Sequence, residues 1–269
     1  MKEALELNFT LFGLDAKGTM TALMIVLDML IVMFIVWLGS LGKQKRPTGP
    51  QNLVEWTVKY LCDYADSIIG EHDAPRYYAL LVMLFLFIFV GNLLGLIPGL
   101  VSPTSSLSVT VTLSVGVWLY TWVEGLRRKG FVKFFAHYFG PKEIPLVIKL
   151  VLFPIELLSD FSRMISLSFR LFGNILAKEV LLGVLVMLIM IFGPKTIESL
   201  KHAEAMGITI NGLIFLIVAV LRPLIIWLGV LVSLIQAGVF TLLTATYIAG
   251  AAISHEEHTA EEEKHHLNV

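Results

Sequence analysis

One arginine, Arg170, lies in a sequence that is otherwise apolar enough for the interior of a lipid bilayer. A guanidinium group keeps its proton at every biological pH. Placing that charge at bilayer depth costs roughly 3 kcal/mol even on the lenient insertion scale. Arg170 is therefore predicted to be a functional residue, and the partner that its chemistry requires is a carboxylate.

Polar residues upstream of Arg170 recur at helical spacing, at successive intervals of three, four, three and four residues, and Asn174 follows four residues later. Because an α-helix has 3.6 residues per turn, these steps keep the side chains on one face. This polar stripe consists of Glu156, Ser159, Arg163, Ser166, Arg170 and Asn174. Glu179 points roughly 140° away from the stripe, so it adds a carboxylate on another face.

Part of the stripe has a second interpretation. Small residues such as Ser159 and Ser166 also permit close helix packing. Glu156 and Arg163 lie near one end of the apolar stretch, where long side chains reach the membrane interface. Arg170 has no such alternative, because apolar residues flank it on both sides.

The last apolar stretch carries a second set of polar side chains, and Gln236 has the only amide deep within it. A buried amide requires hydrogen-bond partners, and a guanidinium on a neighbouring helix would be a suitable one. Ala237 and Gly238 would permit the close approach that this contact requires. The other members of the set are Ser233, Thr241, Thr244 and Tyr247.

Composition indicates an integral membrane protein. Of its 269 residues, 57% are hydrophobic and 15% are charged, whereas soluble domains contain about 25% charged residues. The net charge of -1 says nothing about nucleic acid, and no basic tract suggests a nucleic-acid partner. The single cysteine, Cys62, excludes an internal disulfide and a thiolate metal cluster. The sequence contains no phosphate-binding loop, so no cofactor and no nucleotide hydrolysis by this chain are expected.

Hydropathy and helix breakers predict an all-α polytopic membrane protein with one membrane domain over residues 1–269. Its predicted parts are a first span (20–39), an interfacial amphipathic helix (51–70), a transmembrane hairpin (78–126), two over-length apolar stretches (144–192 and 208–253) and a charged tail (254–269). The segment 51–70 is too charged to span a bilayer, which favours a position at the interface.

The over-length stretches admit two interpretations. A helix of roughly 48 residues is about 72 Å long, against a hydrocarbon core of about 30 Å. Residues 144–192 are therefore either two spans with a turn near Asp160 or one strongly oblique helix. The polar segment from Gly193 to Lys201 is predicted to end this stretch.

Positive charge predicts the orientation. The cationic segments Lys43–Arg46 and Arg127–Lys129 indicate cytoplasmic loops. The N-terminus is then outside and the tail from Ser254 is cytoplasmic. The charge follows the first apolar run rather than preceding it, so this run is interpreted as a retained anchor and not as a cleaved signal peptide.

Several motifs together strongly resemble subunit a of the bacterial F-type ATP synthases. They are Arg170-Leu-Phe-Gly-Asn174 followed by Glu179, Gln236 within 234–247, Asn92-Leu-Leu-Gly-Leu-Ile-Pro98 and Thr112-Leu-Ser114. The resemblance covers residues from about 50 to 253, and its motifs are highly specific.

The resemblance implies a non-catalytic stator subunit of the bacterial inner membrane, with two proton half-channels beside a rotating ring of c subunits. It implies that Arg170 faces the ring's carboxylates, that the over-length stretches are oblique helices along the ring, and that b-type stalk subunits are further partners. Glu179 would belong to the access path from outside, and the stripe from Glu156 to Ser166 to the exit path. The polar positions carried over are Asn92, Ser114, Glu156, Ser159, Ser166, Asn174, Glu179 and Gln236. Protons or sodium ions both remain possible as the coupling ion.

The chain departs from the family pattern at the access path. Some relatives place a histidine on the last helix, where this chain has Gly229, and some carry an acid where this chain has Gly95. Lys178 stands beside Glu179 instead. The access path is therefore expected to use Lys178, Glu179 and water rather than an acid–histidine pair.

Two other classes of protein fit less well. A secondary transporter should show repeated halves with broken helices at matching positions, and the sequence shows none. A purely structural membrane scaffold would not need Arg170.

Overall fold

The computed structural model describes residues 16–41, 50–97, 100–138, 145–202 and 205–252. The described part is all-helical, as hydropathy predicts. Its α-helices are α1 (Ala16–Leu41), α2 (Pro50–Ile69), α3 (Tyr78–Leu94), α4 (Leu107–Tyr138), α5 (Leu146–His202) and α6 (Ala205–Ala252), and two short 3-10 helices, η2 (Ala74–Arg76) and η3 (Pro103–Ser105), lie before α3 and α4. The predicted tail (254–269) and the cationic loop Lys43–Arg46 lie outside the described residues.

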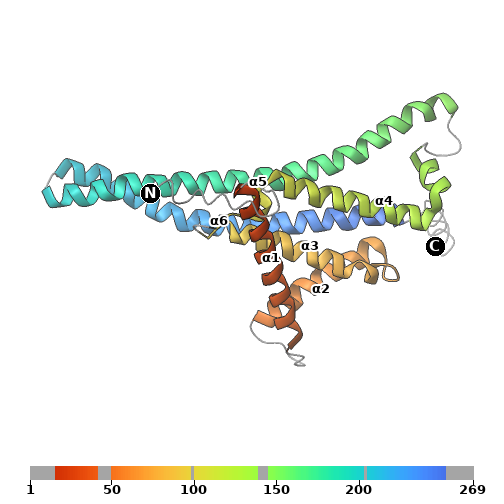
Figure 1. Cartoon of the computed structure of the whole chain (residues 1–269), viewed down its shortest axis with the longest axis horizontal. Helices are drawn as coiled ribbons and strands as arrows, with labels where there is room; N and C mark the ends of the chain where they lie inside the picture. Colours follow the sequence, from red (N-terminus) through yellow and green to blue (C-terminus); the bar gives the residue numbers. More distant parts are fainter. Residues whose placement is uncertain (1–15, 42–49, 98–99, 139–144, 203–204, 253–269) are drawn as a thin grey trace, which may run out of the picture.

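The helices α5 and α6 form the long axis of the molecule and run antiparallel, side by side, over most of their length (Figure 1). They contain 57 and 48 residues, which makes them about 85 and 72 Å long. Of the two interpretations offered for the first over-length stretch, the structure has the single helix, without a turn near Asp160.

The sequence predicts that the polar segment from Gly193 to Lys201 ends the apolar helix. That prediction is wrong, because α5 continues through the segment to His202. A proline removes one backbone N–H and crowds the carbonyl four residues earlier. At Pro194 this local defect interrupts the hydrogen-bond ladder without ending the helix.

The helices α3 and α4 both pack onto the long pair, α3 against α6 and α4 against both α5 and α6, with little contact between α3 and α4 themselves. Beyond the predicted end at residue 126, α4 continues to Tyr138 and changes direction at Gly130. The φ of Gly130 is 74°, in the left-handed region that glycine adopts without strain. After this bend Phe134 lies against Gly125, where a Cβ would stand 2.6 Å from the Phe134 ring.

The amphipathic helix α2 buries one face against α3 and α6. The buried positions recur every four residues and are Leu61, Ala65 and Ile69. The opposite face exposes two stacked aromatic rings, those of Trp56 and Tyr60, whose centroids are 5.9 Å apart. This pattern is the one predicted for the segment, and its position at a membrane interface stays a prediction.

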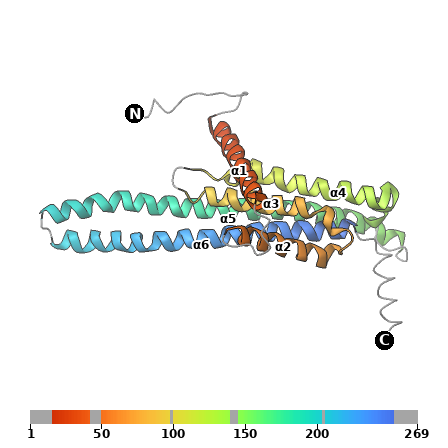
Figure 2. The ribbon, with the colours of Figure 1, turned by 90° about the horizontal axis from the view of Figure 1, so that it is seen from below.

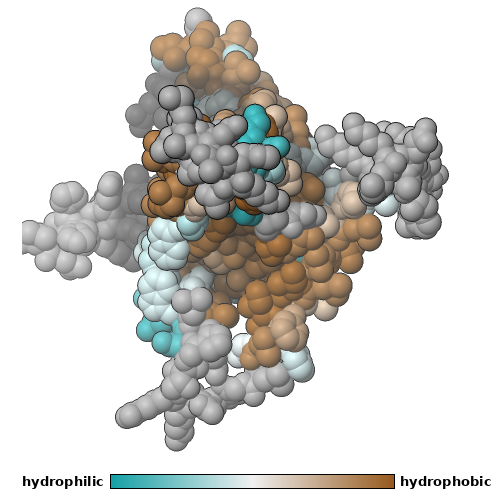
Figure 3. Space-filling view, turned by 90° about the vertical axis from the view of Figure 1, so that its left-hand side faces the viewer, coloured by the Kyte–Doolittle hydropathy of each residue, from teal (hydrophilic) through white to brown (hydrophobic). Residues whose placement is uncertain are grey.

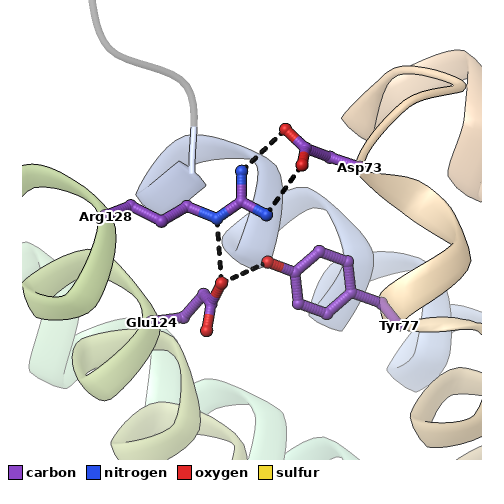
Figure 4. Close-up of polar contacts among 4 residues, drawn as sticks. All are labelled: Asp73, Tyr77, Glu124 and Arg128. Atoms are coloured by element: carbon purple, nitrogen blue, oxygen red, sulfur yellow. Dashed lines mark hydrogen bonds and ion pairs between the residues drawn. The ribbon is translucent and has the colours of Figure 1, made fainter.

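An ion-pair cluster joins the turn before α3 to α4 (Figure 4). Arg128 donates to both carboxylate oxygens of Asp73, at 2.7 and 3.0 Å, and its Nε donates to Glu124 at 2.8 Å. Tyr77 donates to the same Glu124 oxygen at 2.6 Å. The hydrogen bond from Arg128 lowers the pKa of Asp73, and burial, followed by the hydrogen bond to Glu124, raises the pKa of Tyr77.

The first helix, α1, crosses the long pair at a steep angle and contacts α3 (Figure 2). Four segments are long and apolar enough to cross a membrane: Gly18–Gly39, Leu107–Phe131, Ile148–Lys195 and Gly212–Ala251. The helix α3 is also apolar but has only 17 residues. Seen along its long axis, the described surface is largely hydrophobic (Figure 3), which agrees with a chain that lipid or other apolar chains surround.

Candidate functional site

Arg170 lies on the face of α5 that the rest of the described chain leaves open. Its apolar neighbour in the sequence, Phe169, is also exposed, at 61%. The opposite face of the helix is buried at Leu167, Leu171 and Ile175. Within the described residues Arg170 makes no hydrogen bond and no ion pair. A permanent charge on an open apolar face requires a partner from outside this part of the chain.

One turn beyond Arg170, the two long helices are joined by a pair of amides. The Nδ2 of Asn174 donates to the Oε1 of Gln236 at 2.7 Å. Gln236 is only 3% exposed, and its Nε2 has no partner among the described residues. The sequence suggests a guanidinium as the partner of Gln236, and the structure gives Asn174 instead. The side chain of asparagine is shorter than that of arginine. Asn174 nevertheless reaches Gln236, because α5 and α6 are in contact there.

Lys178 is buried between α5, α3 and α6. Its Nζ donates to the backbone carbonyl of Asn92 at 2.8 Å and to the Ser233 hydroxyl at 3.3 Å. The close approach of α6 depends on Gly229, where a Cβ would stand 3.3 Å from Cδ of Lys178 and 2.7 Å from a methyl carbon of Leu96. Because Gly229 has no side chain, the methylene groups of Lys178 fit at this position.

Glu179 contacts the loop that precedes α4. Its Oε1 accepts a hydrogen bond from the backbone N–H of Ser102 at 3.3 Å. A Cβ at Gly95 would stand 3.3 Å from that same carboxylate oxygen and 2.8 Å from Cβ of Ser102. The two glycines at which the chain departs from the family pattern thus border the side chains of Lys178 and Glu179.

A chain of buried hydroxyl and amide groups continues from this point. The Ser102 hydroxyl donates to the carbonyl of Gly91 at 2.8 Å and lies 2.7 Å from the Thr104 hydroxyl. Thr104 donates to Oδ1 of Asn92 at 2.7 Å. We refer to Asn92, Ser102, Thr104, Lys178 and Glu179 together as the Lys178 cluster. Asn92 connects its two halves, because its side chain binds Thr104 and its carbonyl binds Lys178.

A cavity of about 480 Å³ lies toward the other end of α5, between α4, α5 and α6. It is lined by Ser114, Glu156, Asp160 and Arg163, with Lys129 just before the bend of α4 and an aromatic wall that includes Trp118. Arg163 pairs with Asp160 at 3.5 Å, and its guanidinium lies 5.7 Å from the ring centre of Tyr247.

The predicted stripe is divided between these environments. Glu156 and Arg163 line the cavity, whereas Ser166, Arg170 and Asn174 lie on the open face of α5. Ser159 is half-buried and does not line the cavity.

Along α5, Arg170 stands between the two polar regions. It is seven positions along the helix from Arg163 at the cavity and eight from Lys178, which correspond to about 10 and 12 Å. The cavity and the Lys178 cluster share no lining residue. The arrangement therefore has two separate polar regions with a fixed positive charge between them.

Sequence reasoning missed Asp28, on α1. This carboxylate is fully buried at 0% exposure, and neither of its oxygens has a partner among the described residues. The signal was an acid in the middle of the first predicted span, because intramembrane ionisable residues are functional candidates by default.

Long apolar helices and two polar regions on either side of a fixed charge are features of an all-helical membrane protein of the ion-translocating class. A protein-family profile described as ATP synthase A chain matches residues 22–249. ATP synthase subunit a of Helicobacter pylori strain Shi470 is 36% identical over 229 residues, which cover 85% of this chain and 88% of the relative. ATP synthase subunit a of Helicobacter hepaticus is 35% identical over 215 residues, which cover 80% and 81%.

The chain belongs to the ATP synthase A chain family. It is a non-catalytic, proton-conducting membrane subunit of the Fo stator.

Proposed function

We propose that this chain couples proton flow to ring rotation through two half-channels that meet the ring on either side of Arg170. The observation that carries the proposal is Arg170 itself, a partnerless cation within the described chain, on an open apolar face between two polar regions. A ring of c subunits with a carboxylate at the same depth would supply both the missing partner and the apolar surface that this face requires.

Electrostatics gives the role of Arg170. A protonated ring carboxylic acid rotates through lipid at little cost, whereas an ionised one does not. At 4 Å and an effective dielectric constant of 20, a guanidinium favours the ionised form by about 4 kcal/mol. That energy corresponds to about a thousandfold change in the acid's ionisation equilibrium. A ring acid that approaches Arg170 therefore releases its proton, and it takes up another proton after it has passed.

The Lys178 cluster is the proposed access path from outside. Lys178 and Glu179 are the ionisable side chains of this cluster. Asn92 and the two hydroxyl groups of Ser102 and Thr104 provide hydrogen-bonding positions between the loop before α4 and the lysine. Gln236 and Asn174 extend the polar groups along the α5–α6 contact toward Arg170.

The cavity lined by Ser114 and Glu156 is the proposed exit path toward the cytoplasm. Its volume of about 480 Å³ is large enough for many water molecules. Ser159 and Ser166 continue the polar face of α5 from this region toward Arg170.

The proposed setting is the inner membrane of a bacterium, with the N-terminus outside and the C-terminus in the cytoplasm. The helices α5 and α6 are too long to stand upright in about 30 Å of hydrocarbon, so they lie obliquely along the ring. The peripheral stalk, with b-type subunits, is the further proposed partner.

The test is Arg170→Ala, assayed for ATP synthesis and for passive proton permeability of vesicles stripped of the catalytic head. Synthesis should be lost, because the field that ionises the ring acid is gone. Proton leakage should persist or rise, because a protonated ring acid then passes between the half-channels without a full turn. Arg222→Ala, which removes an arginine from α6 instead, is the matched control and should keep synthesis. Near-normal synthesis by Arg170→Ala would overturn the proposal.

A further inference from the structure

The first helix contributes a buried acid that the proposed paths do not use. Asp28 lies on the side of α1 that packs against α3 and η3. Its side chain is 0% exposed, and among the described residues neither carboxylate oxygen has a hydrogen-bond partner. The neighbouring residues Leu27 and Met29 are exposed and apolar, so Asp28 is an acid on the buried face of an apolar helix.

The carboxylate is directed at the backbone of α3 beside the Lys178 cluster. A Cβ at Gly91 would stand 3.1 Å from Oδ2 of Asp28 and 3.7 Å from Pro103. The carbonyl of the same glycine accepts the Ser102 hydroxyl at 2.8 Å. The next residue, Asn92, binds Lys178 through its carbonyl at 2.8 Å. One turn of α3 therefore contacts Asp28 on one side and Lys178 on another.

The charged groups around Asp28 are few. Neither α3 nor η3 presents a titratable side chain near Gly91 in the described chain. From α5, Lys178 and Glu179 reach the same turn and its loop through Asn92 and Ser102.

The helix α2 contacts α1 near Gly39, which lies about 16 Å from Asp28 along α1. The titratable groups of α2 near this contact, Glu55 and Lys59, are therefore far from Asp28. An isolated buried carboxylate is strongly unfavourable, and neutralisation by a proton removes that cost.

We propose that Asp28 is a second proton-binding carboxyl of the access path, located on α1. The proposal rests on the proposed function, since it assumes that the Lys178 cluster receives protons from outside. An O–H bond forms on Asp28 when a proton arrives from the outside water. It breaks when the proton passes, through water and the hydroxyl groups of Ser102 and Thr104, to the Glu179 carboxylate, where a new O–H bond forms and Asp28 returns to its ionised form.

Gly91 leaves the room that the Asp28 carboxylate occupies. A side chain at this position would meet the Asp28 carboxylate at 3.1 Å, and α1 or the aspartate would have to shift by a few tenths of an ångström. Glycine thus allows the carboxylate to approach the backbone beside Ser102. This requirement gives a second variant, Gly91→Ala, that disturbs the position of Asp28 without changing its chemistry.

The test uses inverted membrane vesicles that contain the whole complex, then stripped of the catalytic head, so that the lumen corresponds to the outside. Passive proton conductance is measured over a range of luminal pH for the wild type, Asp28→Asn and Asp28→Glu. Asparagine keeps the shape of the side chain and cannot release a proton. We expect a several-fold loss of conductance in Asp28→Asn and a weaker dependence on luminal pH. The glutamate variant should keep most of the conductance with a shifted pH profile, and Gly91→Ala should lie between the two.

Two control variants, Asp63→Asn and Glu179→Gln, separate the outcomes. Asp63→Asn, the same change at an exposed carboxylate of α2, should leave the conductance unchanged. Wild-type conductance of Asp28→Asn at every luminal pH would overturn the proposal, as would an equal loss in both Asp28 variants with an unchanged pH profile.

If Asp28→Asn fails to assemble, an unshifted profile in Asp28→Glu overturns the proposal instead. Glu179→Gln distinguishes failure of the proposed role of Asp28 from failure of the proposed access path. If it lowers conductance and Asp28→Asn does not, only the role of Asp28 is wrong. If neither variant lowers it, the proposed access path is wrong.

Discussion

Asn174→Leu should destabilise the contact between α5 and α6 more than Gln236→Leu does. The two amides share one hydrogen bond of 2.7 Å, but their surroundings differ. Gln236 is 3% exposed, and its Nε2 is already without a partner among the described residues. Asn174 lies on the open face of α5. Removal of Asn174 therefore leaves a wholly unsatisfied amide in a buried position, whereas removal of Gln236 takes the buried amide away.

The magnitude follows from that asymmetry. A buried polar group that loses its partner costs about 1–3 kcal/mol, whereas replacement of both partners by apolar groups of similar shape is nearly neutral. We therefore expect about 2 kcal/mol for Asn174→Leu, less for Gln236→Leu, and a double leucine variant more stable than Asn174→Leu alone. The coupling between the two substitutions should be about 1–2 kcal/mol, within the range for residues in direct contact.

The assay is the half-life of the purified complex at a fixed elevated temperature, because large membrane assemblies unfold irreversibly. The double variant should recover much of the lost half-life and should still fail in ATP-driven proton pumping, since the polar groups beside Arg170 are gone. If the two effects simply add, the hydrogen bond is not the interaction that joins the helices. If the double variant pumps normally, the amide pair has a structural role only.

Three further predictions concern other parts of the chain. Glu179→Gln should slow ATP synthesis because it removes an ionisable group of the access path, and Glu179→Asp should retain more activity; wild-type rates in the glutamine variant would show that Glu179 only packs. Arg128→Met should shorten the thermal half-life of the complex, because it leaves Asp73 without its bidentate partner. Arg128 lowers the pKa of Asp73, so the stability that this ion pair contributes is fully present above the ordinary aspartate pKa, about 3.9. It is lost as the pH falls through the lower pKa of the folded protein. An equal difference in half-life between wild type and variant at pH 7 and at pH 3 would contradict this reasoning. A cysteine at position 260, introduced after Cys62 is replaced, should react only with reagents that reach the cytoplasm, and labelling by an impermeant outside reagent would reverse the proposed orientation.

The helical spacing of polar residues in the sequence predicted much of the candidate site. The steps of three and four residues place Glu156 and Arg163 on a common side of α5, where they line the cavity. Arg170 was located by a different signal, because a fixed charge in an apolar stretch is conspicuous in the sequence alone. Spacing says little about which side chain meets which across two helices, so the partner of Gln236 required the structure.

The features that the sequence did not reveal depend on contacts between distant segments. Arg128 and Asp73 are 55 residues apart, and nothing in either segment points to the other. Asp28 was visible as an acid within an apolar run, but its burial against Gly91 depends on how α1 crosses α3. The end of α5 was misjudged because the polar segment from Gly193 to Lys201 was treated as a helix terminator, whereas α5 continues through it to His202 and its proline removes only one hydrogen bond of a long helix.

The length of α5 has a consequence for the electric field at Arg170. If the apolar segment Ile148–Lys195, 48 residues long, crosses the membrane obliquely, each residue advances only about 0.6 Å through roughly 30 Å of hydrocarbon. The 15 residues from Arg163 to Lys178 then cover about 9 Å of membrane depth. Aqueous paths on both sides would bring the potential of each compartment up to these residues. The whole transmembrane voltage would fall across about a third of the usual thickness, so the field at Arg170 is about three times the field in the surrounding lipid.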